Sequence, residues 1–279
     1  MSQKYRLDNI GYINRDKKIS FTFNGKKYFG YEGDTLASAL LANGIHLVGR
    51  SFKYHRPRGF FGAGVDEPNA KVQLYKGAKT EPNANATEVE LVEDLIVKSQ
   101  NCWPSVSFDF GAINNLFQKF FPAGFYYKTF MWPKSFWYKV YEPIIRKAAG
   151  LGVAPLKPDP DRYEHKYEYC DVLIAGSGPS GLASALAAAK NGARVILAED
   201  KSRFGGSLLV DEVTIGNKKG KEWADEAISQ LKSMSNVIVK NRSQVFGYYD
   251  HNMMVMFERT RDHIENPNKF TPRQKLWYI

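Results

Sequence analysis

The chain has very little cysteine and no long hydrophobic run. Only Cys102 and Cys170 occur among its 279 residues, too few for a disulfide framework or for a four-thiolate iron–sulfur cluster. No stretch approaches the roughly 18 apolar residues of a spanning helix, and the N-terminus lacks the apolar core of a secretory signal. These absences predict a protein without a membrane span that resides in the cytoplasm, where thiols stay reduced.

Acidic side chains are also outnumbered, 29 against 39 basic ones, for a net charge of +10. Such a surplus favours anionic partners such as nucleotides, acidic subunits, nucleic acid or lipid head groups. A composition that is generally rich in Lys and Asn gives the same surplus of basic residues, so the net charge does not identify a ligand. With 43% hydrophobic and 14% aromatic residues, the chain can build packed cores, and its length fits about two domains.

The first hundred residues predict a hairpin followed by a helix. Polar and apolar residues alternate over 19–23, and Asn24-Gly25, the preferred two-residue turn, leads into 27–31. Thr35 is placed to cap a helix that stops at Asn43-Gly44. A hairpin followed by a helix is typical of a β-grasp module, which we expect over residues 1–100.

A basic and aromatic stretch, 49–59, follows this helix. It could grip a phosphate or carboxylate, or it could be a solvated connection or a contact with another domain. His46 and His55 have no zinc-type spacing and no cysteine nearby, so we expect no metal site.

Prolines interrupt residues 101–165, which we expect to be an irregular bridging segment. Within it, 125–139 interleaves aromatic rings with lysines. Such a pattern could stack on single-stranded nucleic acid, lie at a membrane interface, or be buried against another domain or subunit. We favour the last, because aromatic residues commonly anchor such contacts, and we expect no nucleic-acid partner.

A glycine fingerprint, Gly176-Ser-Gly178-Pro-Ser-Gly181, leaves an apolar strand over 171–175 and opens an Ala-rich helix that ends near Gly192. With a second strand over 194–199, this is a complete βαβ unit of the dinucleotide-binding kind. Gly176 allows the tight turn, Gly178 the close approach of a pyrophosphate, and Gly181 the packing of helix on strand.

Glu199 ends the second strand, 23 positions after Gly176. A carboxylate there accepts ribose hydroxyls and repels a 2'-phosphate, which favours NAD or FAD over NADP. A second glycine pair, Gly205-Gly206, either passes beneath a bound nucleotide or is simply a loop. The pattern continues with a helix around 223–231, a strand at 237–239, a hairpin over 243–259 and a strand from Lys275. We expect residues 166–279 to form a Rossmann-like domain that is truncated at its C-terminus, or completed by another polypeptide.

Long runs of this sequence resemble the alpha subunit of heterotetrameric sarcosine oxidase, specifically its N-terminal portion. The matching runs are Gly33 to Gly44, Gly49 to Gly59, Glu67 to Ala70, Tyr126 to Pro133, Tyr141 to Pro143, Ala148 to Gly152 and Gly205 to Leu208. The resemblance implies a β-grasp module related to 2Fe-2S ferredoxins joined to an FAD/NAD(P)-binding domain. Because the region from Pro57 to Pro68 contains no cysteine, no cluster is expected.

The same resemblance implies that the fingerprint holds NAD, with FAD as the alternative, while FAD and FMN of the wider complex belong to the beta subunit and its interface with alpha. That complex demethylates sarcosine oxidatively to glycine and transfers the one-carbon unit to tetrahydrofolate. Carried over by motif, the dinucleotide would be lined by Gly176, Ser177, Gly178, Pro179, Ser180, Gly181, Glu199, Asp200, Lys201, Gly206, Ser207, Leu208 and Val245. No catalytic residue is assigned. We therefore expect an NAD-binding subunit fragment of an oxidoreductase, inactive by itself; the alternatives are an FAD-binding subunit of another amine or amino-acid dehydrogenase, or a non-catalytic assembly module.

Overall fold

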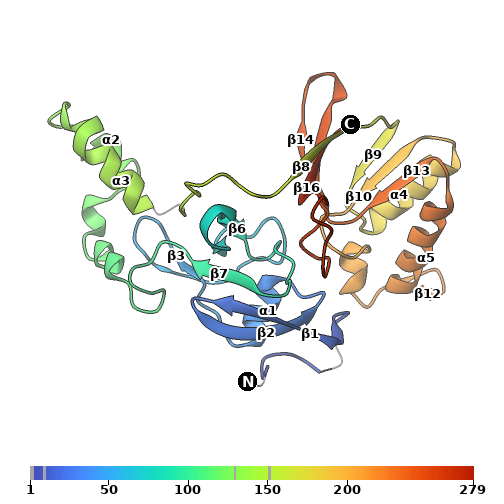
Figure 1. Ribbon diagram of the computed structural model, residues 1–279, viewed down its shortest axis with the longest axis horizontal. Helices are drawn as coiled ribbons and strands as arrows, with labels where there is room; N and C mark the ends of the chain where they lie inside the picture. Colours follow the sequence, from blue (N-terminus) through green and yellow to red (C-terminus); the bar gives the residue numbers. More distant parts are fainter. Residues whose placement is uncertain (1–2, 9–10, 129, 150–151) are drawn as a thin grey trace. The chain divides into compact units, whose positions relative to one another are not determined.

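The computed structural model describes residues 3–8, 11–128, 130–149 and 152–279. The chain divides into two compact units, one made of Met1–Asp8 and Ile13–Pro160, the other of Asn9–Tyr12 and Asp161–Ile279 (Figure 1).

The first unit is built on a five-stranded sheet of order β2-β1-β7-β5-β6, in which only β1 and β7 run parallel. Helix α1 packs on this sheet through Leu36 and Leu40, against a core that includes Phe21 and Val97 (Figure 1). The elements of this unit are β1 (Asn14–Phe23), β2 (Lys26–Glu32), α1 (Leu36–Ala42), β3 (Gly49–Arg50), β4 (Pro57–Arg58), β5 (Lys71–Leu74), η1 (Gly77–Lys79), β6 (Glu81–Asn85), β7 (Leu95–Ser99), η2 (Phe110–Asn115), η3 (Gln118–Phe120), α2 (Phe125–Lys128), η4 (Trp137–Tyr141) and α3 (Glu142–Ala149).

The expected hairpin and capped helix are both confirmed. Asn24 and Gly25 have φ of 49° and 80°, the left-handed pair that a two-residue turn needs. The Thr35 hydroxyl accepts a hydrogen bond from the Ser38 amide at 3.2 Å, so it caps α1. The turn and the cap place β1, β2 and α1 as a β-grasp module requires.

The segment after β7 is less irregular than its prolines predict. The π-helical turn η4 runs directly into α3. Just before Pro143, the amide of Glu142 donates to the carbonyl of Trp137, an i→i−5 bond of the π-turn. Pro143, which has no N–H to donate, is the second residue of α3 and lies where the π-turn passes into the α-helix. Part of the predicted irregular bridge is therefore helical.

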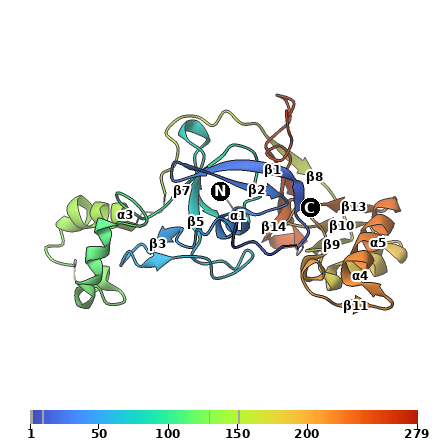
Figure 2. The ribbon, with the colours of Figure 1, turned by 90° about the horizontal axis from the view of Figure 1, so that it is seen from below.

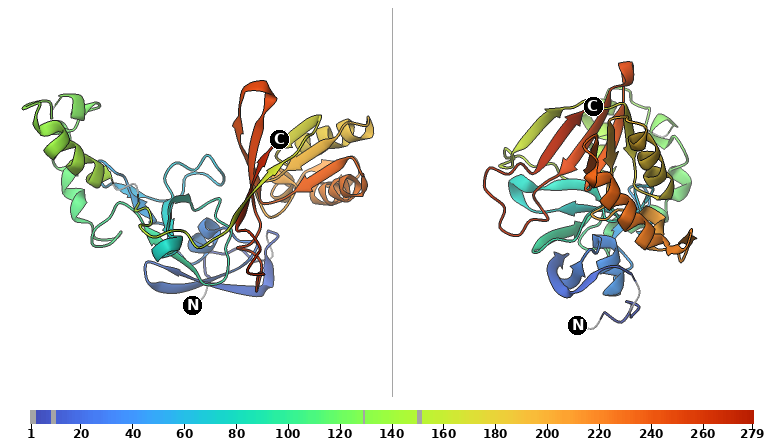
Figure 3. Two further views of the ribbon diagram at one scale, coloured as in Figure 1. Left: turned by 45° about the horizontal axis from the view of Figure 1, so that its top comes forward. Right: turned by 90° about the vertical axis from the view of Figure 1, so that its right-hand side faces the viewer.

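The second unit combines a parallel sheet, β13-β10-β9, with a mixed sheet of order β14-β15-β16-β8. Helices α4 and α5 cover the parallel sheet, with Leu182, Leu197 and Leu231 in their shared core (Figure 2). The elements of this unit are β8 (Tyr163–Tyr167), β9 (Val172–Ala175), α4 (Pro179–Lys190), β10 (Val195–Ala198), η5 (Gly206–Leu209), β11 (Thr214–Ile215), β12 (Lys218–Lys219), α5 (Gly220–Ser233), β13 (Val237–Lys240), β14 (Ser243–Tyr248), η6 (Asp250–Asn252), β15 (Met254–Arg259) and β16 (Gln274–Tyr278). The predicted βαβ unit and hairpin are confirmed (Figure 3).

Among the residues that the structure describes, none lies in a helix both long and apolar enough to cross a membrane. Within the same described ranges, no three His, Cys, Asp or Glu side chains are grouped so that they could hold a metal ion.

Candidate dinucleotide-binding site

The glycine fingerprint forms a sharp turn between β9 and α4. Gly176 has φ of +99° and its amide donates to the carbonyl of Ala198 at 2.7 Å, so the turn stays attached to β10. A Cβ at Gly181 would lie 2.0 Å from the carbonyl oxygen of Gly176. By contrast, a Cβ at Gly178 would meet no atom within 4 Å. The left-handed backbone at Gly176 and the close packing at Gly181 thus require glycine within the chain itself, whereas Gly178 has ordinary backbone angles and faces open space.

That open space lies at the N-terminus of α4. Gly178 is the N-cap and Pro179 follows it, which suits proline because the N–H it lacks has no partner in a first turn. The amides of Ser180 and Gly181 belong to the same first turn, which contains no acidic side chain. The helix dipole and these N–H groups favour an anion at this point, so the residues present fit the diphosphate of a dinucleotide.

Glu199 follows β10 and is only 4% exposed. One carboxylate oxygen accepts the Ser177 amide at 2.9 Å and the Ser177 hydroxyl, while the other accepts the Lys201 amide at 3.0 Å. Burial raises the pKa of Glu199, and so does a hydrogen bond with Asp200, whose own pKa is lowered by that bond and by Lys201 despite its burial. Glu199 therefore fastens the glycine turn to the end of β10. Its contact with a ribose stays a prediction.

The second glycine pair, Gly205-Gly206, lies against the turn formed by the glycine fingerprint. A Cβ at Gly206 would come 2.9 Å from the Cα of Gly178, and the amide of Gly205 donates to the Ser177 hydroxyl at 3.0 Å. Ser207 is exposed, whereas Leu208 is 3% exposed and packs into the core beneath α4 and α5. The backbone of this loop is next to the candidate site, but the side chain of Leu208 serves the core.

Val245, the remaining predicted residue, packs on the second core of the unit with Ala198 and Trp277. It therefore lies near the end of β10 from which Glu199 follows. Hydrogen bonds and close backbone packing unite Ser177, Gly178, Glu199 and the Gly205-Gly206 pair in one network.

Sequence reasoning missed two residues that support this network. The amide of Ser243 donates to the carbonyl of Glu199 at 2.7 Å, and the guanidinium of Arg259 donates to the carbonyl of Asp200. Both hold the backbone after β10 in place from another sheet. No local pattern in the sequence could have indicated them, since Arg259 is 59 positions from Asp200.

The basic and aromatic stretch 49–59 has an internal role. Lys53 donates to the carbonyl of Pro122 at 3.1 Å, Tyr54 to that of Phe121 at 2.6 Å and Arg50 to that of Val106 at 2.8 Å. His55 pairs with the buried Asp109 at 2.6 Å. Of the alternatives that the sequence left open, these contacts favour attachment to another part of the chain.

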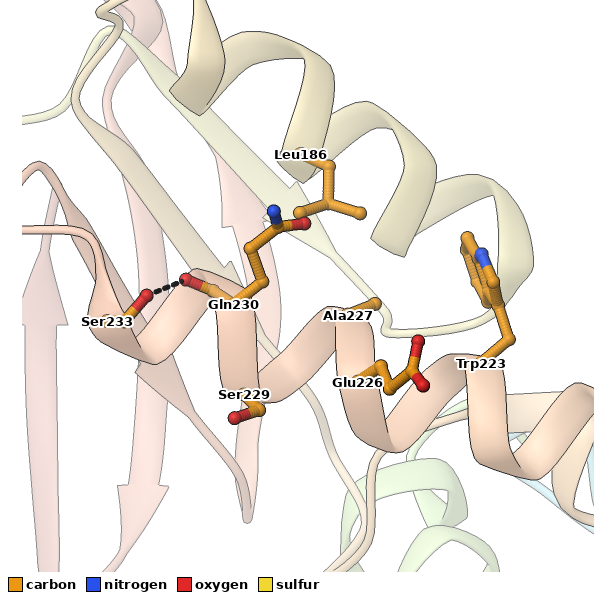
Figure 4. Close-up of a pocket in the computed structure, with 7 residues that line it drawn as sticks. All are labelled: Leu186, Trp223, Glu226, Ala227, Ser229, Gln230 and Ser233. Atoms are coloured by element: carbon orange, nitrogen blue, oxygen red, sulfur yellow. Dashed lines mark hydrogen bonds between the residues drawn. The ribbon is translucent and has the colours of Figure 1, made fainter. Parts of the chain in front are cut away.

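A separate surface groove of about 430 Å³ lies between the helices (Figure 4). Leu186 of α4 lines one side, and residues of α5 such as Trp223 and Gln230 line the other. Glu226, its only ionisable lining group, already pairs with Lys218. The groove contains none of the predicted site residues.

Two protein families match this chain. Residues 16–102 match the 2Fe-2S iron-sulfur cluster binding domain, and residues 171–256 match the FAD dependent oxidoreductase family. The L-proline dehydrogenase of P.horikoshii shares the fold, with a TM-score of 0.52 at 16% identity over 98% of this chain and 41% of that one. The expected fold class, a ferredoxin-like module with a Rossmann-like domain, is confirmed.

Curated relatives match nearly the whole chain. It is 53% identical over 275 residues to the sarcosine oxidase subunit alpha of Rhizobium meliloti (strain 1021), and 30% identical over 269 residues to that of Corynebacterium sp. (strain U-96). These alignments cover 99% and 96% of this chain, which spans 28% and 23% of the two relatives' lengths. Along almost all of its own length, therefore, this chain is related to the alpha subunits of sarcosine oxidase.

Proposed function

We propose that the chain binds an adenine dinucleotide at the turn formed by residues 176–181. The observation that carries this proposal is the contrast within the fingerprint. A side chain at Gly181 would clash with Gly176, yet one at Gly178 would project into open space at the N-terminus of α4. A glycine that the fold does not need, at a place that attracts anions, is best explained by a ligand.

NAD is the dinucleotide we propose, with FAD as the second candidate at the same site. The resemblance carried by the motifs supports NAD, and the buried carboxylate of Glu199 disfavours the extra phosphate of NADP. The match of 171–256 to FAD-dependent oxidoreductases favours FAD. A bound nicotinamide or flavin would supply the redox group, while the turn would hold its diphosphate and orient the ribose near Glu199.

We propose further that the chain works within a sarcosine oxidase-type flavoenzyme. That enzyme would demethylate sarcosine oxidatively to glycine and pass the one-carbon unit to tetrahydrofolate. FAD and FMN would belong to the wider complex, whose beta-type subunit would be this chain's partner, and the location would be cytoplasmic. This part of the alpha-type chain would contribute cofactor binding and no catalytic residue.

Calorimetric titration of the purified chain with NAD and with FAD tests the site. We expect one of the two to bind the wild type and Gly178→Val to lose that binding, because a branched side chain would fill the open space. Ala187→Val, on an exposed position of the same helix, is the matched control and should bind as the wild type does. Equal binding by Gly178→Val, or no binding by any variant, would remove the proposal.

One observation favours an additional assembly role. The segment between β7 and β8 exposes large aromatic side chains, with Trp132 and Tyr138 each 83% exposed. Aromatic residues are favoured anchors of protein interfaces. Replacing both with serine should abolish co-purification with a beta-type subunit while leaving dinucleotide binding unchanged; retained co-purification would exclude this surface as the contact.

A further inference from the structure

The first module matches a family described as a cluster-binding domain, but its residues do not fit a 2Fe-2S cluster. Such clusters are held by four cysteine thiolates, or by two cysteines and two histidines. The matched range, 16–102, contains a single cysteine, Cys102. Of its two histidines, His55 is already paired with Asp109. The described part of the chain also brings no three metal-binding side chains together.

A carboxylate lies inside the loop that connects β4 to β5. Glu67 is 2% exposed, although nothing in the loop is positively charged. One of its oxygens accepts the amides of Phe61 and Gly62 at 2.6 and 2.5 Å. The other accepts the amides of Asn69 and Ala70 at 2.7 and 3.2 Å. An ionised carboxylate has about four acceptor positions, so this network uses all of them.

The four donors come from both ends of the loop, so Glu67 holds the loop closed around itself. A second contact, from the Thr87 hydroxyl to the carbonyl of Gly64 at 2.7 Å, fixes the tip. Without the carboxylate, four backbone N–H groups would converge on an empty centre, and an unsatisfied donor costs up to about 1–3 kcal/mol where it is buried, as in Ala70. The loop conformation thus requires an anion at its centre.

The positions of Glu67 and its donors along this loop match the spacing of cluster-binding cysteines in ferredoxins. Plant-type ferredoxins bind their cluster with C-x4-C-x2-C. That spacing can be placed on this loop with its three positions at Gly62, Glu67 and Ala70. The middle position then supplies the carboxylate, and the outer two are residues whose amides it accepts.

We infer that Glu67 takes the place of a cluster as the anionic centre of this loop, so that the module keeps a ferredoxin-like loop without iron or sulfide. Burial raises the pKa of Glu67, but the hydrogen bonds from the four N–H donors together lower it by more. The pKa of Glu67 therefore lies below its ordinary value. The carboxylate is therefore charged at neutral pH, as the donors require. The module acts as a scaffold and carries no electrons.

The test compares Glu67→Gln with Asp66→Asn in the full chain by hydrogen exchange and mass spectrometry. Both variants remove one negative charge from the same loop, but Asp66 is exposed. In Glu67→Gln the amide NH₂ would face two N–H donors, so we expect exchange across 59–70 to accelerate about ten-fold or more. Asp66→Asn should exchange as the wild type does. Equal exchange in all three proteins would overturn the role of Glu67.

A second measurement does not depend on whether Glu67→Gln folds. The wild-type chain, purified without oxygen and then incubated with ferrous iron and sulfide, should gain no protein-bound iron and no visible absorbance of a cluster. Two iron atoms bound per chain, with the matching absorbance, would refute the inference directly.

Discussion

Replacing Gly181 with alanine tests how closely α4 approaches the preceding turn. The new Cβ would lie 2.0 Å from the carbonyl oxygen and 3.1 Å from the carbonyl carbon of Gly176. Carbon–oxygen contacts normally begin at about 3.3 Å, so the turn and the helix must separate by roughly 1 Å or more. Overpacking of this kind costs typically about 1–3 kcal/mol. Because the obstacle is backbone rather than a mobile side chain, we expect a loss near 3 kcal/mol.

Gly178→Ala is the matched comparison, because it adds the same methyl group three positions earlier. Its Cβ would contact nothing within 4 Å, and φ of −65° with ψ of 179° is open to alanine. The weaker N-cap costs some tenths of a kcal/mol, which the lower entropy of the unfolded chain offsets by about 0.4–1 kcal/mol. Stability should stay within about 0.5 kcal/mol of the wild type, while dinucleotide binding weakens.

Urea unfolding with hydrogen exchange of peptides from 171–200 measures the first effect locally, and calorimetry measures binding. The two variants should separate: Gly181→Ala loses stability and, through it, binding, whereas Gly178→Ala loses only binding. If Gly181→Ala were as stable as the wild type, the close approach would be wrong. If Gly178→Ala bound normally, the open space would not be the ligand site.

Three further outcomes are expected. Thr35→Ala should cost about 1 kcal/mol of unfolding free energy by removing the cap of α1, and Thr35→Ser should restore it; equal stability of all three would contradict the capping role. Ser177→Ala should lower the free energy of unfolding by about 1–3 kcal/mol, because Glu199 loses a donor and the Gly205 amide loses its acceptor. Ser184→Ala, at an exposed position of α4, is the control and should change the free energy of unfolding little in the same urea titration. Since the pKa of Glu67 lies below its ordinary 4.5, its contribution is present above that pH and is lost as the pH falls through the lowered value. Acid unfolding of Glu67→Gln should therefore show a flatter dependence on pH than that of Asp66→Asn, and parallel curves would refute this.

Local pattern was sufficient for much of the fold. A two-residue hairpin turn requires left-handed backbone at both of its central residues, and Asn-Gly is one of the few pairs that adopt it readily. The first hairpin could therefore be predicted from Asn24-Gly25. The fingerprint likewise predicted the turn, the helix and the strand around it, because three glycines at that spacing and a carboxylate at a strand end meet several physical requirements at once.

The sequence by itself therefore determined the first hairpin, helix α1, the βαβ unit and the place of the candidate dinucleotide site, but not the helices within residues 101–165. The tertiary structure decided what each side chain does there. The carboxylate of Glu199 accepts from Ser177, and Leu208 packs in the core, while their predicted contacts with a dinucleotide stay predictions. The role of Glu67 was also decided by the fold, since four backbone amides converge on it only after the loop has closed. The spacing of residues along the chain indicates which residues can lie close together within one element. Burial and hydrogen-bond partners depend on contacts between segments that are far apart in the sequence.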